Sequence, residues 1–99
     1  MKTNVKENGN EHIIEVEGRL DTLTSPALQE LLVDSVSKFK TTVLDFSALE
    51  YVSSAGLRTL LIGEKTAKNR GVSLIIRHVP DSVREVLFMT GFTKILTIE

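Results

Sequence analysis

The sequence predicts an α/β fold, a single domain in which a mixed sheet of about five strands packs against three main helices. Short apolar runs alternate with stretches whose apolar residues recur at helical spacing, which gives the order β-β-α-β-α-β-α-β. The 99 residues are enough for one domain only, so we assign residues 1–99 to it. Strands separated by helices are expected to run parallel through right-handed crossovers, with the helices mainly on one face of the sheet.

The first two strands are predicted to form a hairpin. Residues Thr3 to Glu7 fit a short strand, and Asn8-Gly9-Asn10 contains the Asn-Gly pair that favours a tight turn. The run from His12 to Glu17 is typical of the returning strand, which is expected to end at Gly18.

The first helix is predicted over residues 25–39. Ser25 can cap it, and Pro26 suits its first turn, where a missing backbone N–H costs nothing. The apolar residues that follow are spaced by three or four, as on one face of a helix: Leu28, Leu31, Leu32, Val36 and Phe39.

The second half of the chain alternates strands and helices. Residues 43–46 are short and apolar, as in a strand buried on both faces, and a short loop over the sheet edge is expected after them. A second helix opens with Leu57, Leu60 and Leu61 and is expected to end at Asn69-Arg70-Gly71, where basic residues precede a glycine. Residues 72–76 fit the next strand.

A third helix and a final strand complete the prediction. The helix ends at Met89, just before a glycine. It begins either at Pro80, as its first residue, or at Ser82, which has capping-box spacing to Glu85. Residues 94–98 supply the last strand.

Composition excludes several classes of protein. The chain has no cysteine, so disulfides, thiolate metal sites and thiol nucleophiles are absent. No apolar run approaches the roughly 18–20 residues of a membrane span, and the polar start is not that of a signal peptide, so we expect a cytoplasmic protein. The net charge of −1 gives no reason to expect nucleic acid or an anionic membrane as a partner. Residues 1–50 carry a net −4 and residues 51–99 a net +3, a division that solvated surface usually explains.

The most informative stretch places two adjacent serines, Ser53 and Ser54, at the start of the second helix. In a structural interpretation, a serine there caps the helix with its hydroxyl. In a functional one, the serine accepts a phosphoryl group, which would face the positive end of the helix and add about −1.5 to −2 charges. The small residues Ala55 and Gly56 would let a kinase approach the backbone closely. The local pattern leaves both interpretations open.

Three motifs resemble those of the STAS domain, and most closely those of the stand-alone anti-sigma factor antagonists of bacteria. They are Gly18-Arg19-Leu20-Asp21, then Asp45-Phe46-Ser47 with Tyr51-Val52-Ser53-Ser54-Ala55-Gly56-Leu57, and Met89-Thr90-Gly91-Phe92. The resemblance covers nearly all of the chain and implies a STAS-like fold. It also implies a partner, an anti-sigma factor that is an ATP-dependent serine kinase. The unmodified antagonist binds this kinase and frees a sigma factor, phosphorylation ends the binding, and a serine phosphatase restores it. Because ATP belongs to the partner, we expect no cofactor, and a monomer.

The resemblance also implies roles for individual residues. Ser54 matches the phosphorylated serine, Asp21 matches an aspartate in the loop beside it, and Gly56 matches the glycine that keeps the helix start tight. Many members carry aspartate where this chain has Ser53, so Ser53 offers a second hydroxyl. We prefer Ser54 as the phosphorylation site and Ser53 as the helix cap. Ala55 replaces a small hydroxyl residue that is common in the family.

The second helix supports a further hypothesis. Arg58, Ile62, Lys65 and Asn69 share a face that differs from the leucine face and lies next to Ser54. We interpret it as a docking surface, with Ile62 as the apolar anchor and Arg58 and Lys65 facing an acidic patch. Plain solvated surface is the alternative. Glu64 and Lys68 fall on the core-facing stripe, which suggests that the helix end overhangs the sheet and both side chains reach water.

Two other classes of function deserve comparison with this interpretation. A serine hydrolase needs a base and an oxyanion hole, but His12 and His78 have the character of solvated strand-end residues and no nucleophile-elbow motif is present. We therefore expect neither an enzyme nor a metal site.

The other class is a constitutive STAS binding subunit of a transporter, lipid-transport or stress-signalling complex, which would need no phosphorylatable hydroxyl; this alternative stays open.

Overall fold

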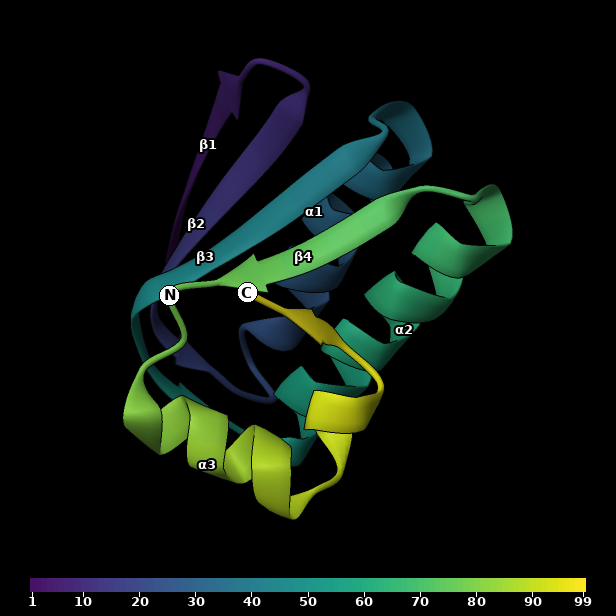
Figure 1. Cartoon of the computed structure of the whole chain (residues 1–99). Helices are drawn as coiled ribbons and strands as arrows, with labels where there is room; N and C mark the ends of the chain where they lie inside the picture. The colour runs from purple at the N-terminus through teal and green to yellow at the C-terminus, as the bar shows by residue number, and fades with distance from the viewer.

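A five-stranded mixed sheet organises the computed structural model, which describes residues 1–99 (Figure 1). Its strands, in both spatial and chain order, are β1 (Lys2–Asn8), β2 (Glu11–Leu20), β3 (Thr41–Val52), β4 (Ser73–Arg77) and β5 (Thr97–Ile98). Strand β1 is antiparallel to β2, and all other neighbours are parallel. The helices are α1 (Ser25–Lys38), α2 (Ser54–Arg70) and α3 (Asp81–Met89), followed by a 3₁₀ turn, η1 (Phe92–Lys94). The predicted fold class and element order are confirmed.

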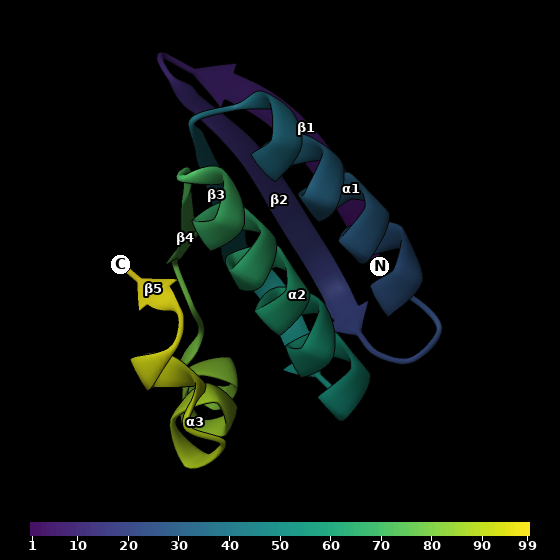
Figure 2. The ribbon, with the colours of Figure 1, turned by 90° about the vertical axis from the view of Figure 1, so that its right-hand side faces the viewer.

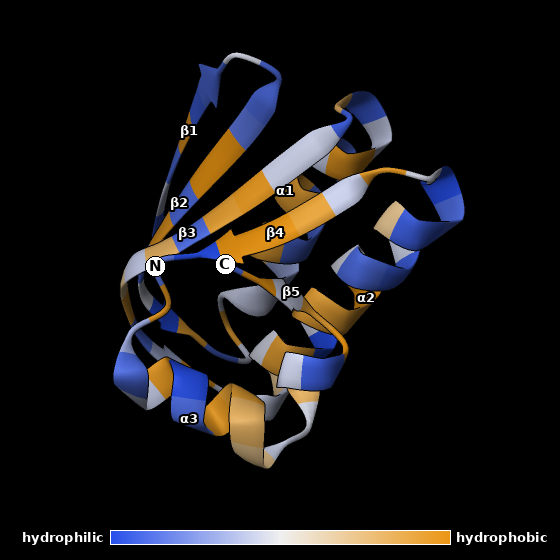
Figure 3. Cartoon of the chain, viewed as in Figure 1, coloured by the Kyte–Doolittle hydropathy of each residue, from blue (hydrophilic) through white to orange (hydrophobic).

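Helices α1 and α2 lie side by side over one face of the sheet, while α3 lies at the end where β3 terminates (Figure 2). The core fills the space between the sheet and these helices. Figure 3 shows its apolar residues along β2, β3 and β4, in contrast to the polar β1. The largest fully buried side chains include Ile14, Leu28, Leu32, Leu44, Phe46, Leu60, Ile76 and Leu87. A Cβ added to Gly63 would collide with Leu32, so glycine allows α2 to approach α1 closely.

Strands β2 and β3 run further than predicted, to Leu20 and Val52. The loop predicted after Phe46 is instead strand. The register between β2 and β3 shifts twice, first after Glu15 and again after Gly18. Such irregularities break the alternation of buried and exposed residues by which a strand is recognised in a sequence, so the pattern underestimates both strands.

Helix α1 begins at Ser25 with Pro26 in its first turn, as predicted, but the predicted caps of α1 and α3 are wrong. Thr24 occupies the N-cap position of α1, and the Ser25 hydroxyl instead donates to the carbonyl oxygen of Asp21 at 2.5 Å. Helix α3 begins at Asp81, so Pro80 is its N-cap residue and not its first residue, and Ser82 is no cap. These details depend on backbone angles at the helix entry, which residue types restrict only loosely.

The predicted end of α2 is confirmed, whereas the predicted last strand is too long. Helix α2 ends as predicted, because Gly71 adopts the left-handed conformation (φ +69°) that glycine favours after a helix. The last strand is shorter than the predicted 94–98, since Phe92–Lys94 form η1 and only Thr97–Ile98 pair with β4.

His12 is not the solvated residue that its position at a strand start suggests. It is only 9% exposed, and its ring stacks on Phe39 with centroids 4.0 Å apart. Its Nδ1 lies 2.5 Å from the Ser35 hydroxyl, which in turn lies 2.6 Å from the Thr42 hydroxyl. This buried polar chain joins β2, α1 and β3 at the end of the sheet away from the start of α2.

Candidate functional site

The site is built where β3 gives way to α2. Ser53 is the N-cap residue, and its hydroxyl oxygen accepts a hydrogen bond from the Gly56 N–H at 3.3 Å. The Ser53 N–H donates to the Leu20 carbonyl oxygen at 2.9 Å, which ties the entry of α2 to the end of β2. The predicted capping role of Ser53 is therefore confirmed.

Ser54 differs from Ser53 in position, exposure and hydrogen bonding. It is the first residue of α2, it is exposed, and its hydroxyl makes no hydrogen bond within the chain. Because Ser53 already serves the helix end, nothing in the fold depends on the Ser54 hydroxyl. That hydroxyl is available for reaction with an approaching group.

Gly56 brings α2 close to the end of β2. A Cβ added there would lie 2.8 Å from Val52 Cγ2 and 2.9 Å from both the Cγ and the carbonyl oxygen of Leu20, closer than real contacts allow. Ala55, half-buried, precedes it. The start of α2 is thus a small, tightly packed surface beside an exposed serine.

Asp21 follows β2 directly and so lies in the loop next to the α2 entry. Its Oδ1 accepts hydrogen bonds from the N–H groups of Leu23 at 3.0 Å and Thr24 at 3.2 Å, and its Oδ2 lies 3.8 Å from Arg19 Nε. The bond from the Thr24 N–H, with the others, holds the pKa of the Asp21 carboxyl below its ordinary value. The carboxylate is ionised, and its hydrogen bonds to the backbone of its own loop stabilise that loop.

The outer face of α2 has the predicted division of residues. Leu57 and Leu60 are buried, whereas Arg58 and Lys65 are exposed and Ile62 is half-buried. Neither Arg58 nor Lys65 forms an ion pair within the chain. The face therefore combines two free cations with a partly accessible apolar side chain, one turn or more along the helix from Ser54.

Glu64 is more buried than predicted, although its carboxylate oxygens keep some contact with solvent. Glu64 is only 7% exposed, because α2 packs over β4 along this part of its length and does not overhang the sheet. Lys68 is exposed, as predicted. Burial raises the pKa of the Glu64 carboxyl, and the Lys68 charge opposes that shift only in part.

The sequence assigns no individual role to several side chains near this end of the sheet. The Arg19 guanidinium lies 4.1 Å above the Tyr51 ring, where β2 and β3 pair. Leu23, Phe88 and Met89 are 90%, 72% and 76% exposed, which is high for large apolar residues. The sequence signals that these residues are apolar, but it cannot show that no other element covers them.

Asp45 fixes the irregular part of β3 that follows it, where the register with β2 shifts. Its Oδ1 accepts from the Ser47 N–H at 2.9 Å, and its Oδ2 lies 3.1 Å from His78 Nδ1. Burial opposes ionisation of Asp45, but the hydrogen bonds from Ser47 and His78 outweigh it and lower the pKa of the carboxyl. These bonds therefore hold the Asp-Phe-Ser motif as an irregular stretch of strand.

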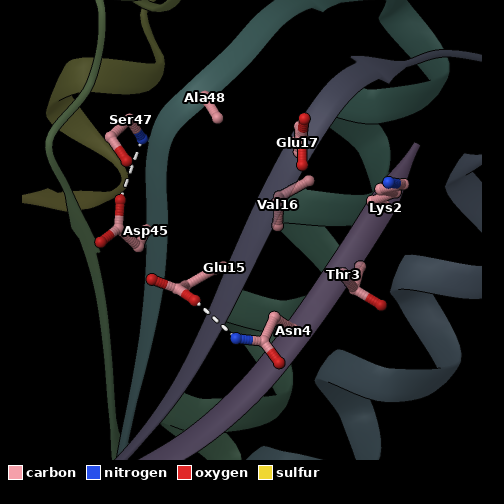
Figure 4. Close-up of a pocket in the computed structure, with 9 residues that line it drawn as sticks. All are labelled: Lys2, Thr3, Asn4, Glu15, Val16, Glu17, Asp45, Ser47 and Ala48. Atoms are coloured by element: carbon pink, nitrogen blue, oxygen red, sulfur yellow. Dashed lines mark hydrogen bonds between the residues drawn. The ribbon is translucent and has the colours of Figure 1, made fainter.

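A shallow cavity of about 350 Å³ lies along β1, β2 and β3 (Figure 4), and neither Ser53 nor Ser54 lines it. Asn4 and Glu15, joined by a 2.9 Å hydrogen bond, lie on one side, and Asp45 with Ser47 on the other. No group of three or more His, Asp or Glu side chains is placed to hold a metal ion. None of the helices is both long and apolar enough to cross a membrane.

Comparison with known families now bears on this geometry. The family model described as "Mlab, STAS domain" matches residues 3–97. The chain belongs to the STAS family. This STAS domain is 31% identical over 84 residues to BtrV of Bordetella bronchiseptica, provisionally named an anti-sigma factor antagonist, with 84% of the chain and 72% of BtrV covered.

Two further comparisons agree with that assignment. The STAS domain is 24% identical over 98 residues to the anti-sigma-B factor antagonist of Bacillus subtilis, with 99% of the chain and 90% of the relative covered. The crystal structure of an anti-sigma factor antagonist from Mycobacterium paratuberculosis superposes with a TM-score of 0.81 at 28% identity, covering 98% and 83% of the two chains. The family resemblance found in the sequence is thereby confirmed.

Proposed function

We propose that this STAS domain is an anti-sigma factor antagonist switched by phosphorylation of Ser54. In its unmodified form it binds an anti-sigma factor with serine kinase activity in the bacterial cytoplasm, and this binding releases a sigma factor. The strongest support is the division of roles between adjacent serines: Ser53 caps α2, and Ser54 stands exposed with a free hydroxyl. The names of the relatives from Bordetella and Bacillus support the general role.

The proposed modification is a phosphoryl transfer from ATP held by the partner. A bond forms between Ser54 Oγ and the γ-phosphorus, the bond from that phosphorus to the β–γ bridging oxygen breaks, and ADP leaves. The hydroxyl proton passes to a base of the kinase. A separate phosphatase reverses the change by hydrolysis. Ser53 is the poorer acceptor, because it is half-buried and its oxygen already accepts the Gly56 N–H.

The proposed docking face consists of Ser54, Arg58, Ile62 and Lys65. Its two unpaired cations suit an acidic patch on the kinase, and Ile62 offers an apolar contact. Phosphorylation adds about −1.5 to −2 charges at one end of this face. Burying that charge against the partner without compensating donors costs more than the ~1.4 kcal/mol that lowers affinity tenfold, so the complex dissociates.

The start of α2 completes the proposed contact surface. Ala55 and Gly56 add no bulk beside Ser54, so the kinase can reach the backbone there. Asp21 and the cap residue Ser53 hold the neighbouring loop and the helix entry in position. The proposal assigns these residues to partner binding through the shape of this surface, and it assigns no catalytic role to any residue of the chain.

The alternative is a constitutive binding subunit of a larger complex. The family description names Mlab beside the STAS domain and so is compatible with this alternative. Under it, Ser54 stays unmodified and is only an exposed first residue of a helix. The two functions therefore differ in one measurable property, which is the phosphorylation of Ser54.

The test is the intact mass of the domain after incubation with Mg-ATP and anti-sigma kinases from its source organism. One added phosphate that is lost in Ser54→Ala and kept in Ser53→Ala supports the switch. A phosphate lost only in Ser53→Ala keeps the switch and moves its site. No phosphate with any kinase, together with stable binding to a transporter or ATPase subunit, supports the constitutive subunit.

A further inference from the structure

Arg58 stands one helical turn after Ser54 on α2 and has no partner. Both residues are exposed, and the Arg58 guanidinium forms no ion pair within the chain. Other cations of this region are engaged or remote. Arg19 pairs with the Asp21 carboxylate and lies over the Tyr51 ring. Lys65 follows Ser54 by eleven residues, which is about 16 Å along a helix axis.

The spacing of four residues suits an interaction between these two side chains. Residues four apart project from the same side of a helix and pair across one turn. An arginine fork matches phosphate oxygens with two parallel N–H bonds, which a lysine cannot do. The position of Ser54 relative to Arg58 is already set, because the Ser53 cap and the packing of Gly56 hold the first turn of α2 in place.

We propose that Arg58 holds the phosphate of phosphorylated Ser54. Phosphorylation then acts twice on the docking face, since it adds negative charge and also withdraws the guanidinium one turn further along α2. The inference rests on the proposed function, because it presupposes that Ser54 is modified. It deepens that function by naming the residue of this chain that receives the phosphate.

The neighbouring acid does not prevent this pairing. The Asp21 carboxylate accepts hydrogen bonds from Leu23 and Thr24 in its own loop and has Arg19 beside it. The Asp21 carboxylate therefore does not pair with Arg58. In the unmodified domain Arg58 is free to face an acidic partner, and in the phosphorylated domain it faces its own chain.

The test uses phosphoserine incorporated genetically at position 54, so that no kinase is needed. The second pKa of the phosphate is measured by ³¹P NMR titration in the otherwise unaltered domain and in Arg58→Gln, Arg58→Lys and Lys68→Gln. Pairing with Arg58 lowers this pKa by roughly 0.2–0.4 units relative to Arg58→Gln, as expected for an exposed ion pair one helical turn away. Arg58→Lys is expected to retain part of the shift. Lys68→Gln removes the same charge at a remote point of α2 and leaves the pKa as it was.

A second readout separates a direct bond from a nearby charge. Phosphorylation is expected to slow solvent exchange of the Arg58 Nε proton several-fold, which a distant charge does not do. Equal phosphate pKa values in the Arg58→Gln and unaltered domains, with unchanged exchange, overturn the proposal. If the pKa shift is present while no kinase modifies Ser54, the pairing stands and the proposed function fails. If a kinase modifies Ser54 and the shift is absent, the pairing alone fails.

Discussion

Gly56 lies so close to Leu20 that a Cβ on it would stand 2.9 Å from the Leu20 carbonyl oxygen. That oxygen also accepts the Ser53 N–H, so it cannot move aside without loss of the bond that joins β2 to α2. We predict that Gly56→Ala lowers the free energy of unfolding by about 1–3 kcal/mol, measured by urea denaturation. Ser54→Ala, which alters an exposed side chain in the same turn, is expected to change it by less than about 0.5 kcal/mol. Equal effects of the two substitutions would contradict the packing argument.

The cap formed by Ser53 predicts a second difference between the two serines. Ser53→Ala removes the acceptor of the Gly56 N–H and is expected to cost about 1 kcal/mol of unfolding free energy. Ser53→Asp keeps an acceptor at the same position and is expected to retain most of the stability. If Ser53→Ala proves as stable as Ser54→Ala in urea denaturation, the capping bond contributes nothing.

The buried chain from His12 to Thr42 predicts a sensitive hydroxyl at Ser35. Ser35→Ala removes the group that links His12 Nδ1 to the Thr42 hydroxyl and leaves both without that partner in a closed environment. The expected loss is about 1–3 kcal/mol in urea denaturation. Ser37→Ala, on the exposed side of the same helix, serves as the control and is expected to lose less than about 0.5 kcal/mol. A loss at Ser35 no larger than this control would mean that the chain is not a stabilising network.

Glu64 predicts a pH dependence of stability with a definite sign. Burial raises the pKa of its carboxyl in the folded state, so between the unfolded and folded pKa values the folded chain binds more protons than the unfolded chain. Stability from this group is therefore present at low pH and is lost as pH rises from about 4 upward. Glu64→Gln removes that loss.

Urea denaturation of the Glu64→Gln and unaltered chains at pH 4 and pH 7 checks this prediction. The stability of Glu64→Gln relative to the unaltered chain is expected to increase between the two pH values. Glu85→Gln, at an exposed position of α3, controls for the loss of one carboxylate. A relative stability that stays constant, or that falls with pH, contradicts the assignment.

The docking face predicts a specific effect on binding. Ile62→Asp places a carboxylate among the residues proposed to meet an acidic patch, so affinity for the anti-sigma kinase is expected to fall at least tenfold, by about 1.4 kcal/mol or more. Calorimetric titration with the kinase measures the effect, and circular dichroism verifies the fold. Asn10→Asp introduces the same charge in the exposed turn between β1 and β2, outside the docking face, and is expected to bind normally. Unchanged affinity of a folded Ile62→Asp variant removes Ile62 from the docking face.

The sequence could predict the fold because its strongest signals are local. The leucines of α2 keep helical spacing, and Gly71 marks the helix end. Ser53 and Ser54 could be located in the same way, since a cap and a first residue are defined by their neighbours. The extension of β3 to Val52 could not be predicted, because it depends on a shifted pairing with β2.

The same limit applies to burial. His12 and Glu64 have the polarity of surface residues, and only the packing of other elements encloses them. The exposure of Phe88 and Met89 is the converse case, in which apolar residues remain uncovered. The polarity and spacing of residues predict which helix or strand they belong to and which face of it they occupy. Whether a side chain is buried depends on which distant segments of the chain pack against it.

The separation of cap and free hydroxyl between Ser53 and Ser54 has a consequence for the life of the protein in a cell. Since the fold makes no use of the Ser54 hydroxyl, the modified and unmodified molecules are expected to resist proteolysis equally and to persist for the same time. Under the proposed function, synthesis and dilution then set the total amount of protein, and the kinase and phosphatase set only the fraction that is phosphorylated. A returning signal can draw at once on molecules already made, without new translation.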